Sequence, residues 1–304
     1  MRIDAIVIGS VVSSRIVLEE LIRAGIPVLK VFSLDEQYSG NVSGYDPIHK
    51  TAEQHGIPAS TFQKINDPAC VEELERLSAD YIFVVGLSQI AGSRIIRAAK
   101  KGVIGFHPTA LPRYRGRAAM VWQVLLGVTD AKCTLFFIDE GMDSGPILGQ
   151  EPYRIGEEDY ASDIEKSLCS ALRKLCRRVF GEMKAGALHP EEQDESQATY
   201  LLKRTPEDGE IDWGQPIEHI YRLIRGTSRP YPGAFSYYDG KEKLIIWHAG
   251  RMENTRYIGR PGQIAEVRER SFDVLCKDGL LRVDEYETEG GRRIVAGHRL
   301  KAKG

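Results

Sequence analysis

The sequence has few cysteines, and their spacing does not fit a metal site or a set of disulfide bonds. The five cysteines are scattered without any Cys-x-x-Cys pair, and their number is odd. A zinc site or a disulfide framework needs paired cysteines, so we expect neither, and no other metal site. The chain also lacks a run of about eighteen apolar residues, which a membrane-spanning helix needs. Its start, MRIDAIVIGS, has no signal-peptide pattern, so we expect a cytoplasmic protein without a membrane partner.

No charge of one sign dominates the composition. The chain has 41 Lys and Arg against 43 Asp and Glu, a net charge of −2. Proteins that bind nucleic acid usually carry a basic excess, so this balance favours small-molecule substrates. Two enzyme motifs are missing as well. The loop IGSVVSS lacks the Gly-x-Gly-x-x-Gly pattern of dinucleotide-binding proteins, and no Gly-x-Ser-x-Gly pattern marks a serine nucleophile beside the candidate residues described below.

The first two thirds of the chain alternate between apolar runs and helical patterns. The expected strands are DAIVIGS, IPVLKVFSL, YIFVVG, VIGFH and CTLFFID, and helical spacing lies between most of them. Short connections between strands and helices are typical of a doubly wound sheet. We therefore predict an α/β fold, with a Rossmann-like, mostly parallel sheet.

The last hundred residues have a different pattern. AFSYYDGKEKLIIWHAGR and SFDVLCKDGLLRVDEYE each read as a hairpin around an Asp-Gly turn. Such short strands predict a small β-barrel or sandwich, and we favour a smaller, mostly β domain with an OB-like barrel. A charged segment with few apolar residues precedes it. We predict a catalytic domain over 1–190, a linker over 191–204 and a C-terminal β domain over 205–304.

Polar side chains follow three of the expected strands. His107 ends one strand, Ser88 and Gln89 follow another, and Asp139 follows a third. Ligands of doubly wound sheets bind beyond the carboxyl ends of the strands, so these residues are expected at one edge. A single histidine is more often a packed or surface residue than a catalytic one. The convergence of several polar groups is what favours a site.

His107 and Asp143 form the expected chemical pair. His107 opens a loop stiffened by prolines, and Asp143 lies in the Gly-rich turn DEGMDSGPIL. Taken alone, Asp143 fits a turn residue equally well. An imidazole and a carboxylate at one edge of a sheet are the components of a general acid–base pair.

These two segments carry a resemblance. GFHPTALPRYRGRAAMVW followed by DEGMDSGPIL resembles the signature of the folate-dependent formyltransferases, a family that includes enzymes acting on methionyl-tRNA and on nucleotide-linked amino sugars. RTPEDGEIDW and RPYPGAFSYYDGK resemble the second domain of its longer members. The resemblance implies an enzyme that uses 10-formyltetrahydrofolate as its co-substrate.

The resemblance also implies roles for individual residues. His107 and Asp143 match the catalytic residues of the family. The residues implied to line the folate pocket are Gln89, Ile90, Ala91, Arg117, Asp139, Gly141, Met142 and Asp143.

One position departs from the family pattern. The family has an asparagine two residues before the histidine, where this chain has Gly105. That asparagine polarises the formyl carbonyl, and an oxyanion donor is commonly worth about 3 kcal/mol. A backbone N–H, Gln89 or Thr109 is needed in its place, unless the protein is inactive. We favour Gln89, because its carboxamide follows a neighbouring strand, and we count it among the catalytic residues.

Three functions remain open for the acceptor. We favour an N-formyltransferase acting on a nucleotide-activated amino sugar of the 4-amino-4,6-dideoxy type, over a methionyl-tRNA formyltransferase and over a non-catalytic folate or sugar-nucleotide binder. The basic residues of the second domain form no long stripe for a tRNA backbone. The sequence leaves a homodimer open. The residues expected to bind the acceptor are Ser13, Thr109, Arg113, Arg115, Arg204 and Arg225.

Overall fold

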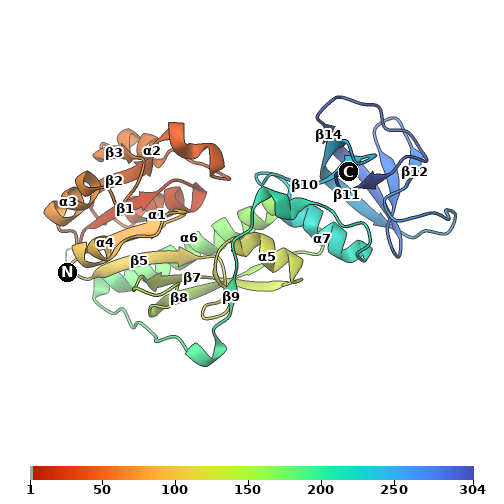
Figure 1. Ribbon diagram of the computed structural model, residues 1–304. Helices are drawn as coiled ribbons and strands as arrows, with labels where there is room; N and C mark the ends of the chain where they lie inside the picture. Colours follow the sequence, from red (N-terminus) through yellow and green to blue (C-terminus); the bar gives the residue numbers. More distant parts are fainter. Residues whose placement is uncertain (1–2) are drawn as a thin grey trace. The chain divides into compact units, whose positions relative to one another are not determined.

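The computed structural model describes residues 3–304, which form two compact units (Figure 1). The first unit contains residues up to 119, 130–154 and 165–201, and the second contains 120–129, 155–164 and 202–304. The domain boundaries at 190 and 205 stay a prediction. None of the helices within residues 3–304 is both long and apolar enough to cross a membrane.

A seven-stranded sheet forms the centre of the first unit, in the order β3-β2-β1-β4-β5-β7-β8. Its strands are β1 (Ala5–Gly9), β2 (Val28–Leu34), β3 (Ala59–Phe62), β4 (Tyr81–Val85), β5 (Gly102–His107), β7 (Asp130–Phe137) and β8 (Ile147–Arg154). The strands from β1 to β5 pair in parallel, whereas β7 runs antiparallel to both β5 and β8. The predicted Rossmann-like, mostly parallel sheet is confirmed.

Helices cover both faces of this sheet. They are α1 (Val12–Arg23), α2 (Ile48–Gln54), α3 (Pro68–Leu77), α4 (Ser93–Ala98) and α6 (Ala161–Ala185), with a short 3₁₀ turn η1 (Glu36–Asn41) after β2. Apolar residues of α3 and α4 share a core with Ile6, Ile8 and Ile82 of the central strands. On the opposite face, Phe180 of α6 meets the ring of Phe83 edge-on, with 5.4 Å between the centroids. Because both faces are covered, the central strands are apolar on both sides.

The order of the strands defines where a ligand would bind. From β1 the chain continues to β2 and β3 on one side, and then returns to β4 and β5 on the other side. Ligands of such sheets bind beyond the carboxyl ends of the strands where the order reverses. Here that point lies beyond β1 and β4.

The second unit is built on a six-stranded antiparallel sheet in the order β12-β13-β14-β11-β10-β15. Its strands are β10 (Ala234–Tyr238), β11 (Glu242–Met252), β12 (Ile264–Val267), β13 (Phe272–Leu275), β14 (Leu280–Thr288) and β15 (Leu300–Lys301), and its helical segments are α5 (Ala119–Leu125), η3 (Pro206–Gly209) and α7 (Ile217–Thr227). Both predicted hairpins are present, as β10–β11 and β13–β14.

The two ends of this second sheet meet. The N–H of Ile264 donates to the carbonyl of His298, and the N–H of Leu300 donates to that of Gly262. The sheet therefore curls into the small barrel that the sequence predicts. Helix α7 was not expected, and it packs Ile220 and Ile224 into the barrel core.

Candidate active site

His107 is buried at the carboxyl end of β5, with 5% of its surface exposed. Its Nε2 lies 2.8 Å from the backbone oxygen of Tyr114. Because a carbonyl oxygen only accepts, Nε2 carries a hydrogen and donates it. The other ring nitrogen, Nδ1, faces Oδ2 of Asp143 at 3.7 Å. Nδ1 is thus the nitrogen left to exchange a proton.

Two opposing effects set the charge of His107. Burial lowers the pKa of the ring below its ordinary value of 6.5, because a charged imidazole loses its water there. The charge of Asp143 and the hydrogen bond to Tyr114 raise the pKa, and burial is the larger effect. At neutral pH the ring is neutral, with a lone pair on Nδ1. Asp143 is placed to stabilise the ring once it has taken a proton.

Asp143 is fixed in an unusual backbone conformation. Its φ is +52°, in the left-handed region that few residues other than glycine adopt. Its Oδ2 accepts a hydrogen bond of 2.7 Å from the N–H of Gly116. Gly116 has a φ of +111°, and the carbonyl of Leu201 leaves no room for a Cβ there. Glycine is therefore required at 116 to deliver the N–H to the carboxylate.

Asp143 reaches His107 by a different route from the one expected. The sequence predicts this turn at the carboxyl edge of a parallel sheet, but β7 is antiparallel to β5 and its last residue, Phe137, pairs with Ile104. The turn therefore starts near the beginning of β5 and folds back towards its end. Asp139 shapes this turn, because its Oδ1 accepts hydrogen bonds from the N–H of Gly141 and from Oγ of Ser144.

The loop after β4 is hydrogen-bonded to the loop that follows His107. Nη2 of Arg117 donates to the backbone oxygen of Ser88 over 2.6 Å. The carboxamide of Gln89 is bonded at both ends to the 63–65 segment, with Oε1 accepting from Ile65 N–H and Nε2 donating to the carbonyl of Gln63. One hydrogen of Nε2 is left for another partner. The role of Gln89 as the donor that replaces asparagine stays a prediction.

Asn66 is a further loop residue, which the sequence analysis missed. Its Nδ2 donates to the carbonyl of Ile90, and its Oδ1 accepts from the N–H of Gly92. In this loop the side chain of Ile90 has 78% of its surface exposed, while Ala91 packs into the core. An asparagine just ahead of a helix gives no signal of this role in the sequence.

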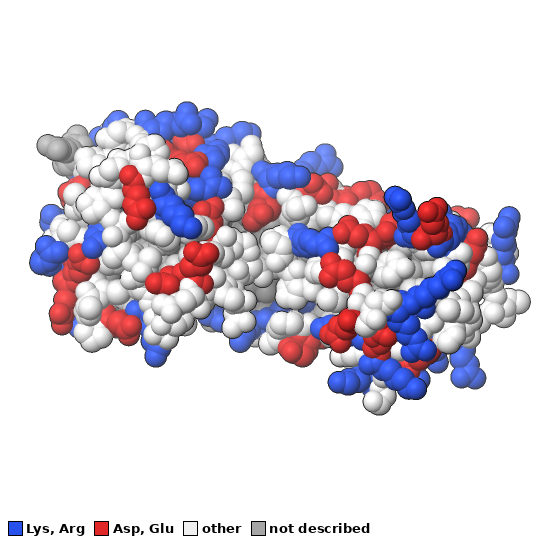
Figure 2. Space-filling model, turned by 90° about the horizontal axis from the view of Figure 1, so that it is seen from above, with Lys and Arg blue, Asp and Glu red and all other residues white. Residues whose placement is uncertain are grey.

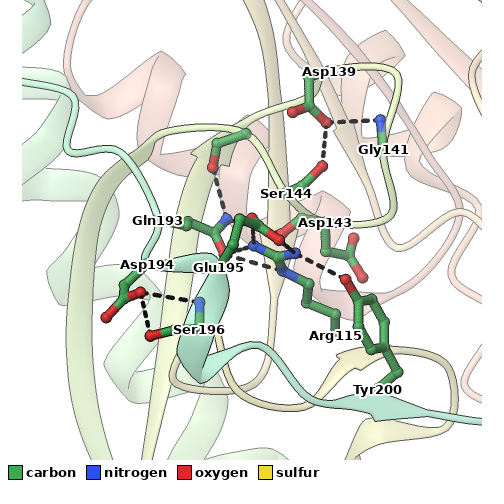
Figure 3. Close-up of polar contacts among 11 residues, drawn as sticks. Arg115, Asp139, Gly141, Asp143, Ser144, Gln193, Asp194, Glu195, Ser196 and Tyr200 are labelled. Carbon is green, nitrogen blue, oxygen red and sulfur yellow. Dashed lines mark hydrogen bonds and ion pairs between the residues drawn. The ribbon is translucent and has the colours of Figure 1, made fainter.

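Two of the expected acceptor-binding residues in this unit are buried. Arg115 is 1% exposed, and its guanidinium donates to Gln193, Glu195 and Tyr200 (Figure 3). Thr109 is fully buried, and its hydroxyl donates to the carbonyl of Arg113. Their polar groups are bonded within the protein, and their role in binding the acceptor stays a prediction. Both residues shape the loop after His107.

The other expected acceptor residues have different surroundings. Arg113 is exposed on the loop, and Ser13 is half-buried in the first turn of α1. In the second unit, Arg204 is half-buried and its guanidinium lies over the ring of Trp122, with 5.0 Å to the centroid. Arg225 is buried and donates to the carbonyls of Gly156 and Asp159. These hydrogen bonds give Arg225 a structural role, and its role in binding the acceptor stays a prediction.

The chain matches two family profiles. Residues 2–179 match the family described as "Formyl transferase", and residues 203–303 match "Formyl transferase, C-terminal domain". A methionyl-tRNA formyltransferase of Lachnospira eligens is 31% identical over 290 residues, which cover 93% of this chain and 91% of that protein.

Solved structures show the same fold. An N-formyltransferase of Helicobacter canadensis, solved with folinic acid and dTDP-3-aminofucose, has a TM-score of 0.69 at 18% identity, and the match covers 94% of this chain and 100% of that one. HypX of Aquifex aeolicus, solved with tetrahydrofolic acid, has a TM-score of 0.66 at 15% identity. That match covers 95% of this chain and 45% of HypX, so the present chain spans less than half of that protein.

Proposed function

The chain belongs to the formyl transferase family, and from this premise we propose that it moves a formyl group from 10-formyltetrahydrofolate to the amine of a nucleotide-activated amino sugar. The observation that carries the proposal is the pairing of His107 with Asp143. Nε2 of His107 is bonded to a carbonyl, and Nδ1 faces the carboxylate at 3.7 Å. This arrangement supports transfer of a proton through Nδ1.

The chemistry follows from the side chains. The acceptor amine attacks the formyl carbon, and a tetrahedral intermediate forms with negative charge on the formyl oxygen. Neutral His107 takes a proton from the amine nitrogen at Nδ1, and Asp143 stabilises the resulting imidazolium. As the bond from carbon to the folate nitrogen breaks, His107 returns a proton to that nitrogen. The products are a formamide and tetrahydrofolate.

The residues around the pair suit a folate. Ile90 and Met142 expose 78% and 55% of their surfaces on two loops tied to the loop after His107, by Arg117 and by Gly116 respectively. Exposed apolar side chains beside polar groups are what a flat heterocycle needs from its binding site. The folate compounds bound to the two structural relatives agree with this choice of co-substrate.

Part of the positive charge of the second unit is already paired with carboxylates. Five of its thirteen arginines form ion pairs with carboxylates, in Arg222–Glu218, Arg229–Glu285, Arg251–Glu158, Arg268–Asp273 and Arg282–Asp273. On the face shown in Figure 2, acidic and basic side chains are interspersed over both units. A tRNA backbone is bound by cations whose charge is not already neutralised. Among the residues expected to bind the acceptor, Arg113 and Arg204 are the arginines that are exposed or half-exposed, and we propose them for a diphosphate.

Methionyl-tRNA is the second candidate acceptor. One observation favours it, the 31% identity to a methionyl-tRNA formyltransferase over nearly the whole chain. A further alternative is a non-catalytic folate or sugar-nucleotide binder, because Gly105 stands where the family has its asparagine.

A competition among acceptors tests the proposal. The protein is incubated with 10-formyltetrahydrofolate and, in parallel, nucleotide 3-amino sugars, nucleotide 4-amino sugars and methionyl-tRNA. Mass spectrometry then identifies the acceptor that gains a formyl group, with His107→Asn as the matched control. We expect a formylated amino sugar. Formylation of methionyl-tRNA alone would identify the second candidate, and binding without transfer to any acceptor would favour the non-catalytic alternative.

A further inference from the structure

We propose that residues 191–201, which follow α6, form a strap that positions the catalytic pair, with Gln193 as its positioning residue. The proposal rests on the proposed roles of His107 and Asp143. The sequence suggested a linker here, but the strap is bonded to the first unit at both ends. Glu191 exchanges two backbone hydrogen bonds with Ile147, and β9 (Tyr200–Leu201) pairs in parallel with β6 (Arg115–Gly116).

Gln193 holds the turn that carries Asp143. Its Nε2 donates to the backbone oxygen of Asp143 over 2.8 Å and to that of Gly145 over 2.7 Å. Both hydrogens of the amide are therefore donated to carbonyls of the turn, those of Asp143 and Gly145. A left-handed conformation at a non-glycine residue is unfavourable and persists only where the surroundings impose it. Gln193 supplies that constraint at Asp143.

Arg115 in turn holds Gln193. Oε1 of Gln193 accepts from Nε of Arg115 over 3.2 Å and from Nη2 over 2.8 Å. The same guanidinium donates to both carboxylate oxygens of Glu195, over 2.6 and 3.0 Å (Figure 3). Arg115 thus fixes which end of the carboxamide points at the turn, because only the amide nitrogen can donate to carbonyls.

The strap also contacts the loop that orients His107. Tyr114, whose carbonyl accepts from His107, has a φ of +63°. Its N–H donates to Oγ1 of Thr199 over 2.9 Å. The residues with left-handed backbone on the two sides of the pair, Tyr114 and Asp143, are therefore bonded to the same short segment. One element sets the distance between Nδ1 and the carboxylate.

A pair of Gln193 variants, measured in the full chain, tests this role. Gln193→Met has similar length but loses both hydrogen bonds to the turn, and Gln193→Glu keeps the acceptor for Arg115 while losing the donor. The control is Arg173→Met, which removes an arginine paired with Glu19 and Glu20 on the other side of the sheet. The titration of His107 is followed by NMR of histidine labelled with nitrogen-15, assigned with His107→Asn. Asp143→Asn gives the shift for complete loss of the carboxylate charge.

We expect the pKa of His107 to fall in Gln193→Met, in the direction of Asp143→Asn, because the carboxylate of Asp143 moves away from Nδ1. Gln193→Glu adds a negative charge of its own, so the kinetic measurement is the readout for that variant. We expect kcat for formyl transfer to fall roughly tenfold or more, with the KM for the folate changed less than about twofold. Arg173→Met should change neither quantity.

Unchanged titration and kcat in Gln193→Met would overturn the proposal. Loss of the folded state in both Gln193 variants, with Arg173→Met still folded, would overturn it too, because the strap would then be a general stabilising element. The titration needs no turnover. If the wild-type protein transfers no formyl group, the proposed function fails while the titration still reports whether the strap sets the His107–Asp143 geometry.

Discussion

Phe136 lies directly opposite Gly105 in the β5–β7 ladder, and its ring fills the space beside that glycine. A Cβ at position 105 would lie 2.9 Å from Cζ of Phe136 and 3.0 Å from Cγ1 of Ile138. Real Cβ atoms essentially never come as close as 2.9 Å to another heavy atom. Because the formyltransferase pattern has asparagine here, the ring occupies volume that the asparagine would need. Glycine and phenylalanine are a matched pair in this chain.

The pair predicts that Gly105→Asn is unfavourable. Overpacking in a dense core typically costs about 1–3 kcal/mol, so we expect the free energy of unfolding to fall by that amount and kcat to fall as well. In the double variant with Phe136→Ala, the two changes should cost less together than the sum of their separate costs. Urea unfolding of the two single variants and the double variant measures this coupling.

Gly181→Ala is the matched control for Gly105→Asn. Gly181 lies within α6, and a Cβ there would meet nothing within 4 Å. Alanine favours a helix over glycine by about 1 kcal/mol, so stability should rise. A stable and more active Gly105→Asn would contradict the matched pair.

Because Gly105 has no side chain, another group must stabilise the negative charge that develops on the formyl oxygen. We predict that this group is Gln89, which has one amide hydrogen left after bonding to the 63–65 segment. Gln89→Ala should lower kcat by roughly a hundredfold, the usual cost of an oxyanion donor, with a smaller effect on folate binding. Steady-state kinetics separate the two effects. A raised KM with unchanged kcat would contradict this prediction and would mean that Gln89 only stabilises the loop after β4.

The burial of His107 predicts a pH dependence of stability. The pKa of His107 is lowered from 6.5 in the folded state, so below pH 6.5 the unfolded chain binds the proton more readily. The contribution to stability is complete above pH 6.5 and is lost as the pH falls towards the folded-state pKa. His107→Asn should remove this loss, and Asp143→Asn should enlarge it. Urea unfolding over a pH series measures the slope, and equal slopes for the wild-type protein and His107→Asn would contradict the prediction.

Arg113 and Arg115 should behave differently although they lie two residues apart. Arg115→Met removes charge-assisted hydrogen bonds from the interior and should cost about 1.5–3 kcal/mol of stability. Arg113→Met changes an exposed side chain, so it should leave stability unchanged and raise the KM for the acceptor. Thermal unfolding and acceptor titration test both variants. The reverse pattern, a stable Arg115→Met and an unstable Arg113→Met, would refute the assignment.

Strong local patterns made much of the fold predictable. YIFVVG and DAIVIGS became β4 and β1 because continuous apolar runs fit a strand buried on both faces. β8 was missed, since ILGQEPYR is largely polar and lies at the edge of the sheet, where it pairs with β7. Helix α7 was missed because the β patterns around it dominated the interpretation of that region.

The site was predictable only where the chemistry is local. His107 and Asp143 stand out because each follows an apolar strand in a distinctive loop. Arg115 looked like its neighbours in the sequence, and only its partner Glu195, 80 residues away, shows that it is buried. The strap looked like a linker because its order comes from hydrogen bonds rather than from apolar burial. Such long-range polar contacts leave no periodic signal in a sequence.

Transfer of a labelled formyl group tests the central claim most directly. The protein is mixed with 10-formyltetrahydrofolate carrying carbon-13 in the formyl group and with the acceptor identified by the competition experiment, and the label is followed by NMR in a single turnover. We predict that the label moves to the acceptor amine as a formamide while an equal amount of tetrahydrofolate appears, and that His107→Asn and Asp143→Asn slow this step by orders of magnitude. Release of the label as formate by the wild-type protein, or transfer at the wild-type rate by His107→Asn, would contradict the account.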